Sequence, residues 1–260
     1  TSCSENNNND PAEETADVAG SYPGYTVASS RMFQNMVTPD ENLQVTVASN
    51  GAVTVSLESE SWGDILIENA GLTYSDNGYT LTGTGNATMG MGDSKKDYTC
   101  ELSGRIANRL AQMQFSCPQV MGGLTIEFRQ GDIPASLVLP GTYSGYTKAS
   151  FQYAPEGITA NSQTITIAAT ESGKFSISYV SDTWGSFEIP EAEASYENGA
   201  FKLQGTGTTM MGMGTTVSEY NCNMEGTIDV AKENPSITFT VPAVMGGLTI
   251  EFFPGTAPAE

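Results

Sequence analysis

The sequence predicts an all-β protein made of two tandem eight-stranded antiparallel barrels of the up-and-down type. Three observations support this fold class: a composition rich in Gly, Ser and Thr, a duplication that covers most of the chain, and about eight short β-patterned segments in each copy. The 260 residues are enough for each half to form its own core. A two-sheet sandwich for each half is the alternative architecture.

The duplication is clearest in VMGGLTIEF, which occurs letter for letter at 120–128 and at 244–252. Further matches follow in the same order along both halves: YPGYT (22–26) with YSGYT (143–147), Trp62-Gly63 with Trp184-Gly185, and MGMG at 89–92 with MGMG at 211–214. Ordered matches over this distance indicate a copied folding unit. They predict a first barrel over 18–134 and a second over 138–256.

The strands are predicted from alternating apolar residues and turn signals. In the first copy, alternating segments flank Asn50-Gly51, and a second hairpin is expected at Asn77-Gly78. Gly122-Gly123 suits a turn with positive φ, after which Leu124 begins a closing strand. Eight such strands bury their alternate residues best in a closed barrel, because closure leaves no exposed sheet edge.

These features resemble the calycin-like β-barrel domains found as lipoproteins in gut-dwelling Gram-negative anaerobes, distant relatives of lipocalins and fatty-acid-binding proteins. The resemblance covers each copy almost end to end and rests on MGMG, the Trp-Gly pair and VMGGLTIEF. A lipocalin would carry Gly-x-Trp on its first strand and an Arg near its last strand. Here the first strand carries Tyr22 and Tyr25, and the last strand ends in Phe128-Arg129 or Phe252-Phe253.

Residues 1–17 are polar and acidic, so we expect a flexible tether that buries no core. Thr1-Ser2-Cys3 resembles the end of a bacterial lipobox, in which the cysteine is acylated. We therefore expect Cys3 to attach the protein to the outer membrane of a bacterial cell envelope, on its periplasmic or outer side. The alternative is an unmodified cysteine in a disordered tail.

The charge and the absence of histidine exclude several functions. Ten Lys and Arg residues against 30 Asp and Glu residues give a net charge of −20, which repels phosphate backbones, so no nucleic-acid binding is expected. The chain contains no His, which removes Ser-His and Cys-His nucleophile pairs and ordinary His zinc sites. We expect no enzymatic activity, no cofactor and no metal.

Three further cysteines lie in the barrel segments. A tight hairpin at Asn108-Arg109 would place Cys100 directly opposite Cys117 on neighbouring strands. A disulfide between them is geometrically allowed, and two buried thiols acting as small apolar side chains are equally open. Cys222 has no evident partner and is expected to pack as a free thiol.

Aromatic and methionine residues that recur in both copies are the candidate ligand contacts. The two tryptophans follow polar segments, which favours positions at a barrel mouth. On a strand, Met89 and Met91 would point to one face, and the MGMG glycines would leave room beside these flexible thioethers. The same pattern fits a purely structural role, because Met fills irregular cores and Gly lets a barrel strand bend. The candidates are Trp62, Trp184, Met89, Met91, Met211, Met213, Tyr25 and Tyr146.

Two functions remain after these exclusions. The first is a lipid-anchored binding protein in which each barrel holds a small apolar or amphipathic ligand. An eight-stranded barrel is wide enough either to be filled by side chains or to hold one small molecule. The second is a structural or interaction module with filled barrels that binds an envelope protein or a glycan. A hydrolase is the least favoured.

Overall fold

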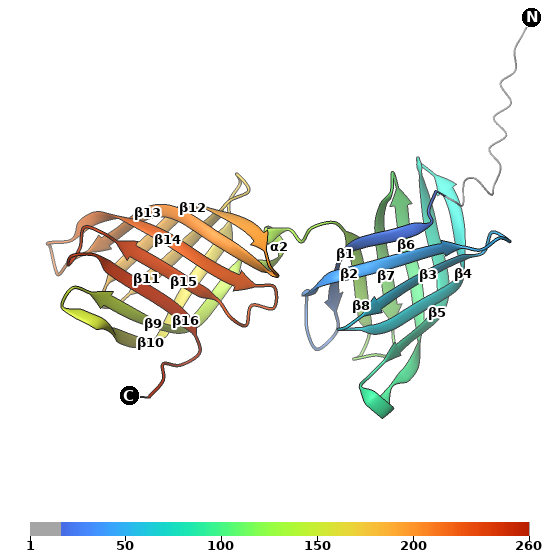
Figure 1. Cartoon of the computed structure of the whole chain (residues 1–260), viewed down its shortest axis with the longest axis horizontal. Helices are drawn as coiled ribbons and strands as arrows, with labels where there is room; N and C mark the ends of the chain where they lie inside the picture. The colour runs from blue at the N-terminus through green and yellow to red at the C-terminus, as the bar shows by residue number, and fades with distance from the viewer. Residues whose placement is uncertain (1–16, 260) are drawn as a thin grey trace, which may run out of the picture. The chain divides into compact units, whose positions relative to one another are not determined.

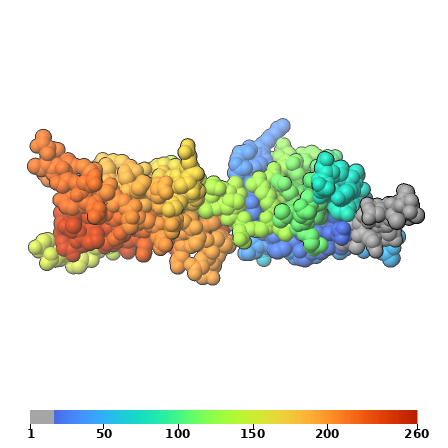
Figure 2. All heavy atoms as spheres, turned by 90° about the horizontal axis from the view of Figure 1, so that it is seen from above, coloured from blue at the N-terminus to red at the C-terminus, as the bar shows by residue number. Residues whose placement is uncertain are grey.

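A computed structural model describes residues 17–259. Figure 1 shows one closed barrel formed by the N-terminal half of the chain and a second formed by the C-terminal half, and the chain divides into these two compact units after Ile133. The predicted fold class is therefore confirmed. In the space-filling view, loops project beyond the walls of both units (Figure 2).

The first barrel, barrel 1, is an up-and-down meander in which each strand pairs antiparallel with the next and β1 pairs with β8 to close the ring. Its strands are β1 (Gly20–Ser29), β2 (Met36–Val47), β3 (Val53–Ser59), β4 (Gly63–Ser75), β5 (Gly78–Met89), β6 (Lys96–Ala107), β7 (Leu110–Cys117) and β8 (Leu124–Gln130). A short 3-10 helix, η1 (Gly92–Ser94), lies between β5 and β6.

The second barrel, barrel 2, repeats this order and closes between β9 and β16. The short helix α2 (Ala135–Val138) precedes it. Its strands are β9 (Gly141–Phe151), β10 (Ala154–Ala169), β11 (Phe175–Ser181), β12 (Gly185–Glu197), β13 (Ala200–Met211), β14 (Ser218–Asp229), β15 (Ser236–Val241) and β16 (Leu248–Pro254). None of the helices among the described residues is long and apolar enough to cross a membrane.

The hairpin turns agree with the sequence in position more closely than in type. Asn108 and Arg109 form the expected two-residue turn, both with positive φ. The turn predicted at Asn50-Gly51 is a three-residue loop, because Ala48 pairs with Ala52 and Gly51 takes the left-handed position with φ +85°. An asparagine in the sequence predicts a turn but does not distinguish a two-residue turn from a three-residue loop.

The glycines of the repeated motifs lie where strands approach each other closely. A Cβ on Gly24 would stand 2.1 Å from the carbonyl oxygen of Arg129, and one on Gly145 would stand 1.9 Å from that of Phe253. Both contacts join the first strand of a barrel to its last. The glycine of the Tyr-x-Gly-Tyr motif is therefore required for closing the ring in both copies.

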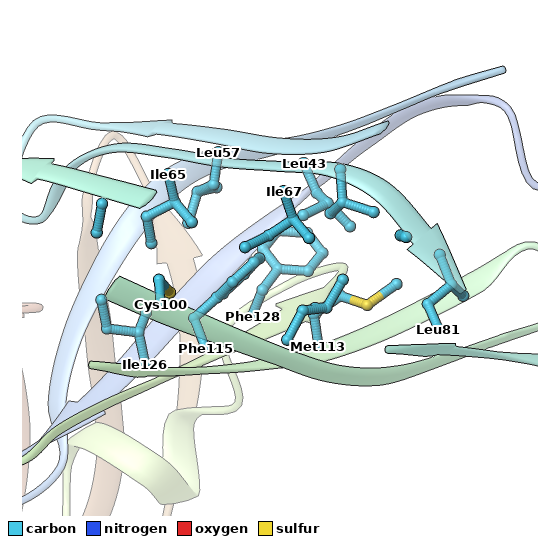
Figure 3. Close-up of a cluster of buried hydrophobic side chains, with 14 of the residues drawn as sticks. Leu43, Leu57, Ile65, Ile67, Leu81, Cys100, Met113, Phe115, Ile126 and Phe128 are labelled. Carbon is cyan, nitrogen blue, oxygen red and sulfur yellow. The ribbon is translucent and has the colours of Figure 1, made fainter. Parts of the chain in front are cut away.

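Side chains from every strand fill the interior of each barrel. In barrel 1, a fully buried cluster of mainly aliphatic residues surrounds Phe115 and Phe128 (Figure 3). In barrel 2, the rings of Tyr179, Phe187 and Phe239 contact one another, with centroids 5.1 to 5.8 Å apart. Both interiors are packed apolar cores.

Both barrels are covered in the same way at the end where their first strand begins. The hydroxyl of Tyr22 donates to the carbonyl oxygen of Val18, and Arg109 from the β6–β7 hairpin lies over the tyrosine ring at 5.4 Å. Tyr143 and Lys232 form the equivalent pair in barrel 2, at 5.7 Å. A cation over a buried aromatic ring therefore covers this end, which we call the base.

Candidate binding site at the barrel rims

The connections from odd-numbered to even-numbered strands lie together at the end opposite the base, because successive strands of an up-and-down barrel alternate in direction. We call this end the rim. In barrel 1 the rim comprises residues 30–35, 60–62, 90–95 and 118–123. In barrel 2 it comprises residues 152–153, 182–184, 212–217 and 242–247.

Exposed apolar side chains collect at and beside both rims. Two methionines recur at matching positions: Met91 and Met213 are each 85% exposed, and Met121 and Met245 are 47% and 48% exposed. Isolated exposed apolar residues are ordinary in proteins, but these methionines recur at matching positions at one end of both barrels. Other exposed apolar residues at or next to the rims are Met32, Met36, Tyr153, Met210 and Val217.

Met121 and Met245 have an uncommon backbone conformation. Their φ values are +49° and +51°, in the left-handed region that non-glycine residues rarely occupy. The following glycines also have positive φ, which confirms the predicted Gly-Gly turn, and the turn closes through a 2.8 Å hydrogen bond from Gly123 N–H to Val120 O. Holding a methionine in this conformation costs about 1 kcal/mol, and both copies retain it.

The two tryptophans lie at the rims, in the β3–β4 and β11–β12 turns. Trp62 is buried and stacks on Phe33 from the β1–β2 connection, with centroids 5.6 Å apart. Its Nε1 has no hydrogen-bond acceptor among the described residues. Trp184 is half-buried and meets Phe151 edge to face at 5.8 Å. Each barrel therefore has an aromatic pair at its rim.

The MGMG methionines divide into two kinds. Met89 and Met211 end strands β5 and β13 with their side chains turned toward the core. The prediction that Met91 shares a strand face with Met89 is wrong, because β5 ends at Met89 and Gly90 turns the chain with φ +121°. Met91 and its counterpart Met213 are loop residues that point into solvent.

Tyr25 and Tyr146 lie on the outer walls. Tyr25 pairs in register with Arg129 while its neighbour Thr26 pairs with the inward-facing Phe128, so Tyr25 points away from the core, although it is only 4% exposed. The ring of Tyr146 packs against Phe253 at 5.4 Å. The structure does not bring either tyrosine to the rim beside Trp62 or Trp184.

A buried polar cluster lies below the rim of barrel 1. Glu41 is only 4% exposed, and its Oε1 accepts a 2.9 Å hydrogen bond from Ser59 Oγ. Burial raises the pKa of Glu41 to about 7, the Ser59 hydrogen bond opposes this rise, and the charge of Glu60 adds to it. Glu41 Oε2 and the hydroxyl of fully buried Thr26 have no hydrogen-bond partner among the described residues.

The matching position of barrel 2 is occupied by Gln163. It stands two residues before Ile165, which pairs with Tyr143, just as Glu41 stands two residues before Leu43, which pairs with Tyr22. Gln163 Oε1 accepts a 2.6 Å hydrogen bond from the Tyr179 hydroxyl. Barrel 2 thus satisfies this acceptor with its own tyrosine, whereas barrel 1 leaves a carboxylate oxygen unpaired.

The sequence interpretation missed Glu41, Phe33 and the Met121–Met245 pair. Glu41 lies on the same alternating face as Leu43 and Val45, so strict period-2 counting would have placed a carboxylate inside the barrel. Phe33 lies in the β1–β2 connection, which had no readable pattern.

The cysteines are free thiols inside the barrels. The β6–β7 register continues to place Cys100 opposite Cys117, and a thiol–thiol hydrogen bond together with burial raises the pKa of Cys100. Their disulfide stays a prediction. Cys222 is also buried and free, and burial raises its pKa to about 11. Cys3 lies outside the described residues.

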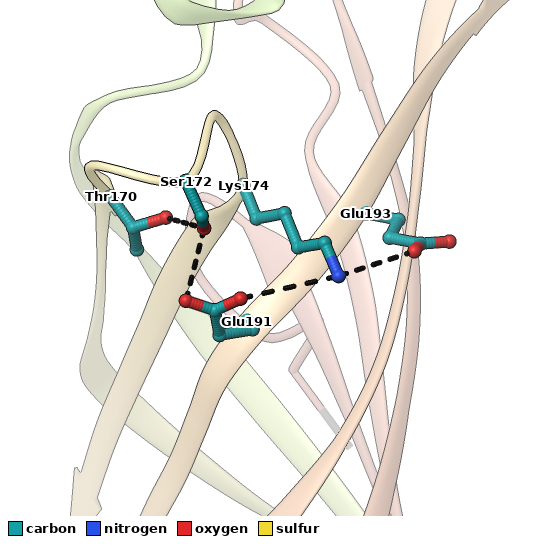
Figure 4. Close-up of polar contacts among 5 residues, drawn as sticks. All are labelled: Thr170, Ser172, Lys174, Glu191 and Glu193. Carbon is teal, nitrogen blue, oxygen red and sulfur yellow. Dashed lines mark hydrogen bonds and ion pairs between the residues drawn. The ribbon is translucent and has the colours of Figure 1, made fainter.

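The outer wall of barrel 2 carries exposed carboxylates. Lys174 Nζ lies 4.0 Å from Glu191 and 3.5 Å from Glu193, and Ser172 donates to Glu191 at 3.0 Å (Figure 4). Exposed pairs of this kind contribute little to stability. The two carboxylates bracket a lysine and do not face each other across a cleft, so their geometry does not suit glycoside hydrolysis.

A groove of about 520 Å³ lies on the same wall. Charged and polar side chains line it, including Glu197, Lys202, Gln204 and Glu225. Within residues 17–259, no three His, Cys, Asp or Glu side chains are placed to hold a metal ion.

Comparison with solved structures identifies the architecture. The chain is similar to the crystal structure of a provisionally named outer membrane protein of Bacteroides fragilis NCTC 9343, with a TM-score of 0.60 and 22% identity over 93% of this chain and 98% of that one. A DUF3598-family protein of unknown function from Nostoc punctiforme PCC 73102 aligns at 12% identity over 92% of this chain and 97% of that one, with a TM-score of 0.26. No curated protein matches the sequence.

The family comparison agrees with the duplicated barrels. The model of the calycin-like β-barrel domain matches residues 18–129 and, separately, residues 139–256. These segments contain the strands of the two rings except for Gln130, the last residue of β8. The chain therefore belongs to the calycin-like β-barrel domain family and carries two tandem copies of the domain.

Proposed function

We propose that this protein is a non-enzymatic, lipid-anchored binding protein of the cell envelope in which each barrel rim binds one small apolar or amphipathic ligand. The observation that carries the proposal is the recurrence of exposed methionines at matching rim positions, Met91 with Met213 and Met121 with Met245. Flexible thioethers adapt to ligands of different shape. Each ~100 Å² of apolar surface that a ligand covers contributes about 2.5 kcal/mol before the cost of association.

The packed interiors favour binding at the rim over binding deep inside a barrel. The base of each barrel is covered by a tyrosine–cation pair, and the middle is filled by buried apolar residues. At the rim, Trp62 and Trp184 adjoin the exposed loops, and each forms an aromatic pair with a neighbouring phenylalanine. A ligand there would lie across the loops with its apolar chain covered by the exposed methionines.

Two observations support a location in the cell envelope. Cys3 stands at the end of a lipobox-like sequence, followed by a polar spacer. The similar Bacteroides fragilis structure bears the provisional name of an outer membrane protein. Mass spectrometry of the full-length protein from its native membrane should find Cys3 acylated, and an unmodified cysteine there would contradict the anchor.

Binding at the rims is tested with 1-decanol, a small neutral amphiphile, and the intrinsic tryptophan fluorescence of the full chain. The double variant M91S/M213S should weaken binding several-fold, because each substitution removes a thioether that the ligand covers. Leu110→Ser is the matched control, since Leu110 is 66% exposed but lies in the β6–β7 hairpin at the base. Equal binding by the rim variant and the wild type would contradict the proposal.

The second candidate is an interaction module, which the packed interiors also favour. In that case the exposed surfaces would contact an envelope protein or a glycan, and no small amphiphile would bind. Native mass spectrometry of the protein from its own membranes, combined with a pull-down, separates the two: a bound small molecule supports the first function, and a stoichiometric macromolecular partner supports the second.

A further inference from the structure

Barrel 1 holds a buried carboxylate that has no counter-ion among the described residues. Glu41 faces inward from β2, and one of its oxygens, Oε1, is occupied by the hydroxyl of Ser59. The other oxygen, Oε2, is buried and accepts no hydrogen bond from the described residues. Burying a carboxylate oxygen without a partner is costly, so this geometry requires an explanation.

The carboxylate lies directly below the rim. Its partner Ser59 is the last residue of β3, and the Ser59 hydroxyl oxygen also accepts the backbone N–H of Trp62 at 3.2 Å. One hydroxyl thus links the carboxylate of Glu41 to the turn that carries the rim tryptophan. The β3–β4 turn is therefore connected to Glu41 through the two hydrogen bonds of the Ser59 hydroxyl.

A second unpaired oxygen lies in the same layer of the barrel. Thr26 on β1 is fully buried, its Oγ1 has no partner among the described residues, and it pairs in register with Thr38 on β2. Gly24, two residues earlier, pairs with Glu41. Thr26 and Glu41 therefore project inward from neighbouring strands, on either side of the register shift in β2.

The chemistry of this layer favours a cation that donates hydrogen bonds. A carboxylate oxygen and a hydroxyl both accept hydrogen bonds, and an ammonium group supplies three N–H donors. The stacked rings of Phe33 and Trp62 at the rim offer π faces that attract the same kind of charge. Among residues 17–259 no arginine or lysine is paired with Glu41, so the carboxylate would repel an anionic head group there.

Barrel 2 lacks this arrangement. Gln163 replaces the carboxylate, and its oxygen already accepts the Tyr179 hydroxyl at 2.6 Å. Thr147, the counterpart of Thr26, is likewise buried and unpaired, but no charge lies beside it at the position of Glu41. The two rims share exposed methionines and differ in the group beneath them.

Resting on the proposed rim function, we propose that the rim of barrel 1 binds amphipathic amines, with the ammonium head group paired to Glu41 and Thr26 and the apolar chain covered by the rim methionines. The rim of barrel 2 binds neutral amphiphiles without a preference for an amine. The two barrels of one chain thus differ in ligand class.

The chain allows each rim to be observed separately, because it contains only two tryptophans. In the full-length Trp184→Phe variant, Trp62 reports on barrel 1, and in Trp62→Phe, Trp184 reports on barrel 2. Each variant is titrated at physiological ionic strength with decylamine, 1-decanol and decanoate, which share one alkyl chain and differ in head group. Barrel 1 should bind decylamine at least tenfold more tightly than 1-decanol, and decanoate most weakly.

Glu41→Gln in the Trp184→Phe background should reduce the preference for decylamine over 1-decanol to about one, while 1-decanol binding stays unchanged. The matched control is Glu58→Gln, which removes an exposed carboxylate from the outer face of the same strand that carries Ser59. It should leave the preference intact. Circular dichroism of both variants verifies that each remains folded.

The possible outcomes separate this inference from the rim function. If decylamine and 1-decanol bind barrel 1 equally, the rim function stands and the amine site is wrong. If Glu58→Gln lowers the preference as much as Glu41→Gln, the general negative field of the protein is responsible and the amine site is again wrong. If none of the three amphiphiles binds either rim, both proposals are wrong.

Discussion

The two barrels have the same frame and different interiors, and this difference shows which parts of the duplicated unit fix the fold. Both copies keep the glycine at ring closure, the left-handed methionine before Gly-Gly, and the tyrosine–cation pair at the base. Leu57 and Ile65 of barrel 1 are replaced by Tyr179 and Phe187 in barrel 2. Backbone approach and turn geometry tolerate little change, whereas a core tolerates substitution if its volume is filled.

The replacement of Leu57 by Tyr179 also explains why the polar side chains beneath the two rims have different hydrogen-bond partners. Tyr179 stands where barrel 1 has Leu57, and its hydroxyl reaches Gln163. Leu57 offers no such donor, so among the described residues Ser59 alone donates to Glu41. One position in the third strand of each barrel therefore decides whether the side chain at the position of Glu41 or Gln163 receives a hydrogen bond from a core tyrosine.

The largest effect is expected where the two barrels are identical. Gly145→Ala places a Cβ 1.9 Å from the carbonyl oxygen of Phe253, so β9 and β16 cannot pair as they do, and barrel 2 should lose more than about 3 kcal/mol of stability. The control is Gly173→Ala, which also lies in barrel 2, has φ +81° and has open space around it. It should cost only about 1 kcal/mol. Urea unfolding measures both, and equal losses would contradict the close-approach explanation.

The next largest expected effect is a pH dependence of the stability of barrel 1. Burial raises the pKa of Glu41 from 4.5 to about 7, so the folded protein holds a proton that the unfolded chain has released. The stability that this group contributes is complete below pH 4.5 and is lost as the pH rises through about 7, and the fall amounts to at most about 3 kcal/mol. Thr26, Ser59 and Glu60 are the polar and charged groups that face or adjoin it.

Glu41→Gln should therefore flatten the stability of barrel 1 between pH 5 and pH 8, and it should make the protein more stable than the wild type at pH 8. Urea unfolding in the Trp184→Phe background follows barrel 1 through Trp62. Glu58→Gln serves as the control and should keep the wild-type slope. An unchanged slope in Glu41→Gln would show that Glu41 is ionised like an ordinary surface carboxylate.

A smaller effect compares the two cores directly. Phe239→Leu removes two ring contacts, at 5.8 Å to Tyr179 and 5.1 Å to Phe187, whereas Phe115 at the same position of barrel 1 packs among aliphatic residues such as Ile65 (Figure 3). Because an aromatic pair adds about 0.5–1.5 kcal/mol beyond area burial, Phe239→Leu should cost about 1–3 kcal/mol more than Phe115→Leu. Equal costs in urea unfolding would show that ring contacts do not distinguish the cores.

Most of the fold could be predicted from the sequence, because duplication, alternation and turn residues act locally. The candidate site was harder to predict from the sequence. Alternation does not show where β5 ends, so Met91 was assigned to a strand although Gly90 turns the chain before it. The position of Glu41 inside barrel 1 follows from alternation, and its contact with Ser59 follows the β2–β3 register, in which Leu43 pairs with Leu57. The position of Thr26 relative to Glu41 depends on a shift in the β1–β2 register next to Asp40.

The central claim is that the apolar chains of the ligands lie at the rims and not in the packed middle of the barrels. The most direct test is NMR of the full chain labelled with ¹³C in its 11 methionine methyl groups, titrated with 1-decanol. We predict that the resonances of Met91, Met121, Met213 and Met245 shift, and that those of the buried interior residues Met113 and Met224 do not. Shifts at Met113 and Met224 with unchanged rim resonances would contradict the account.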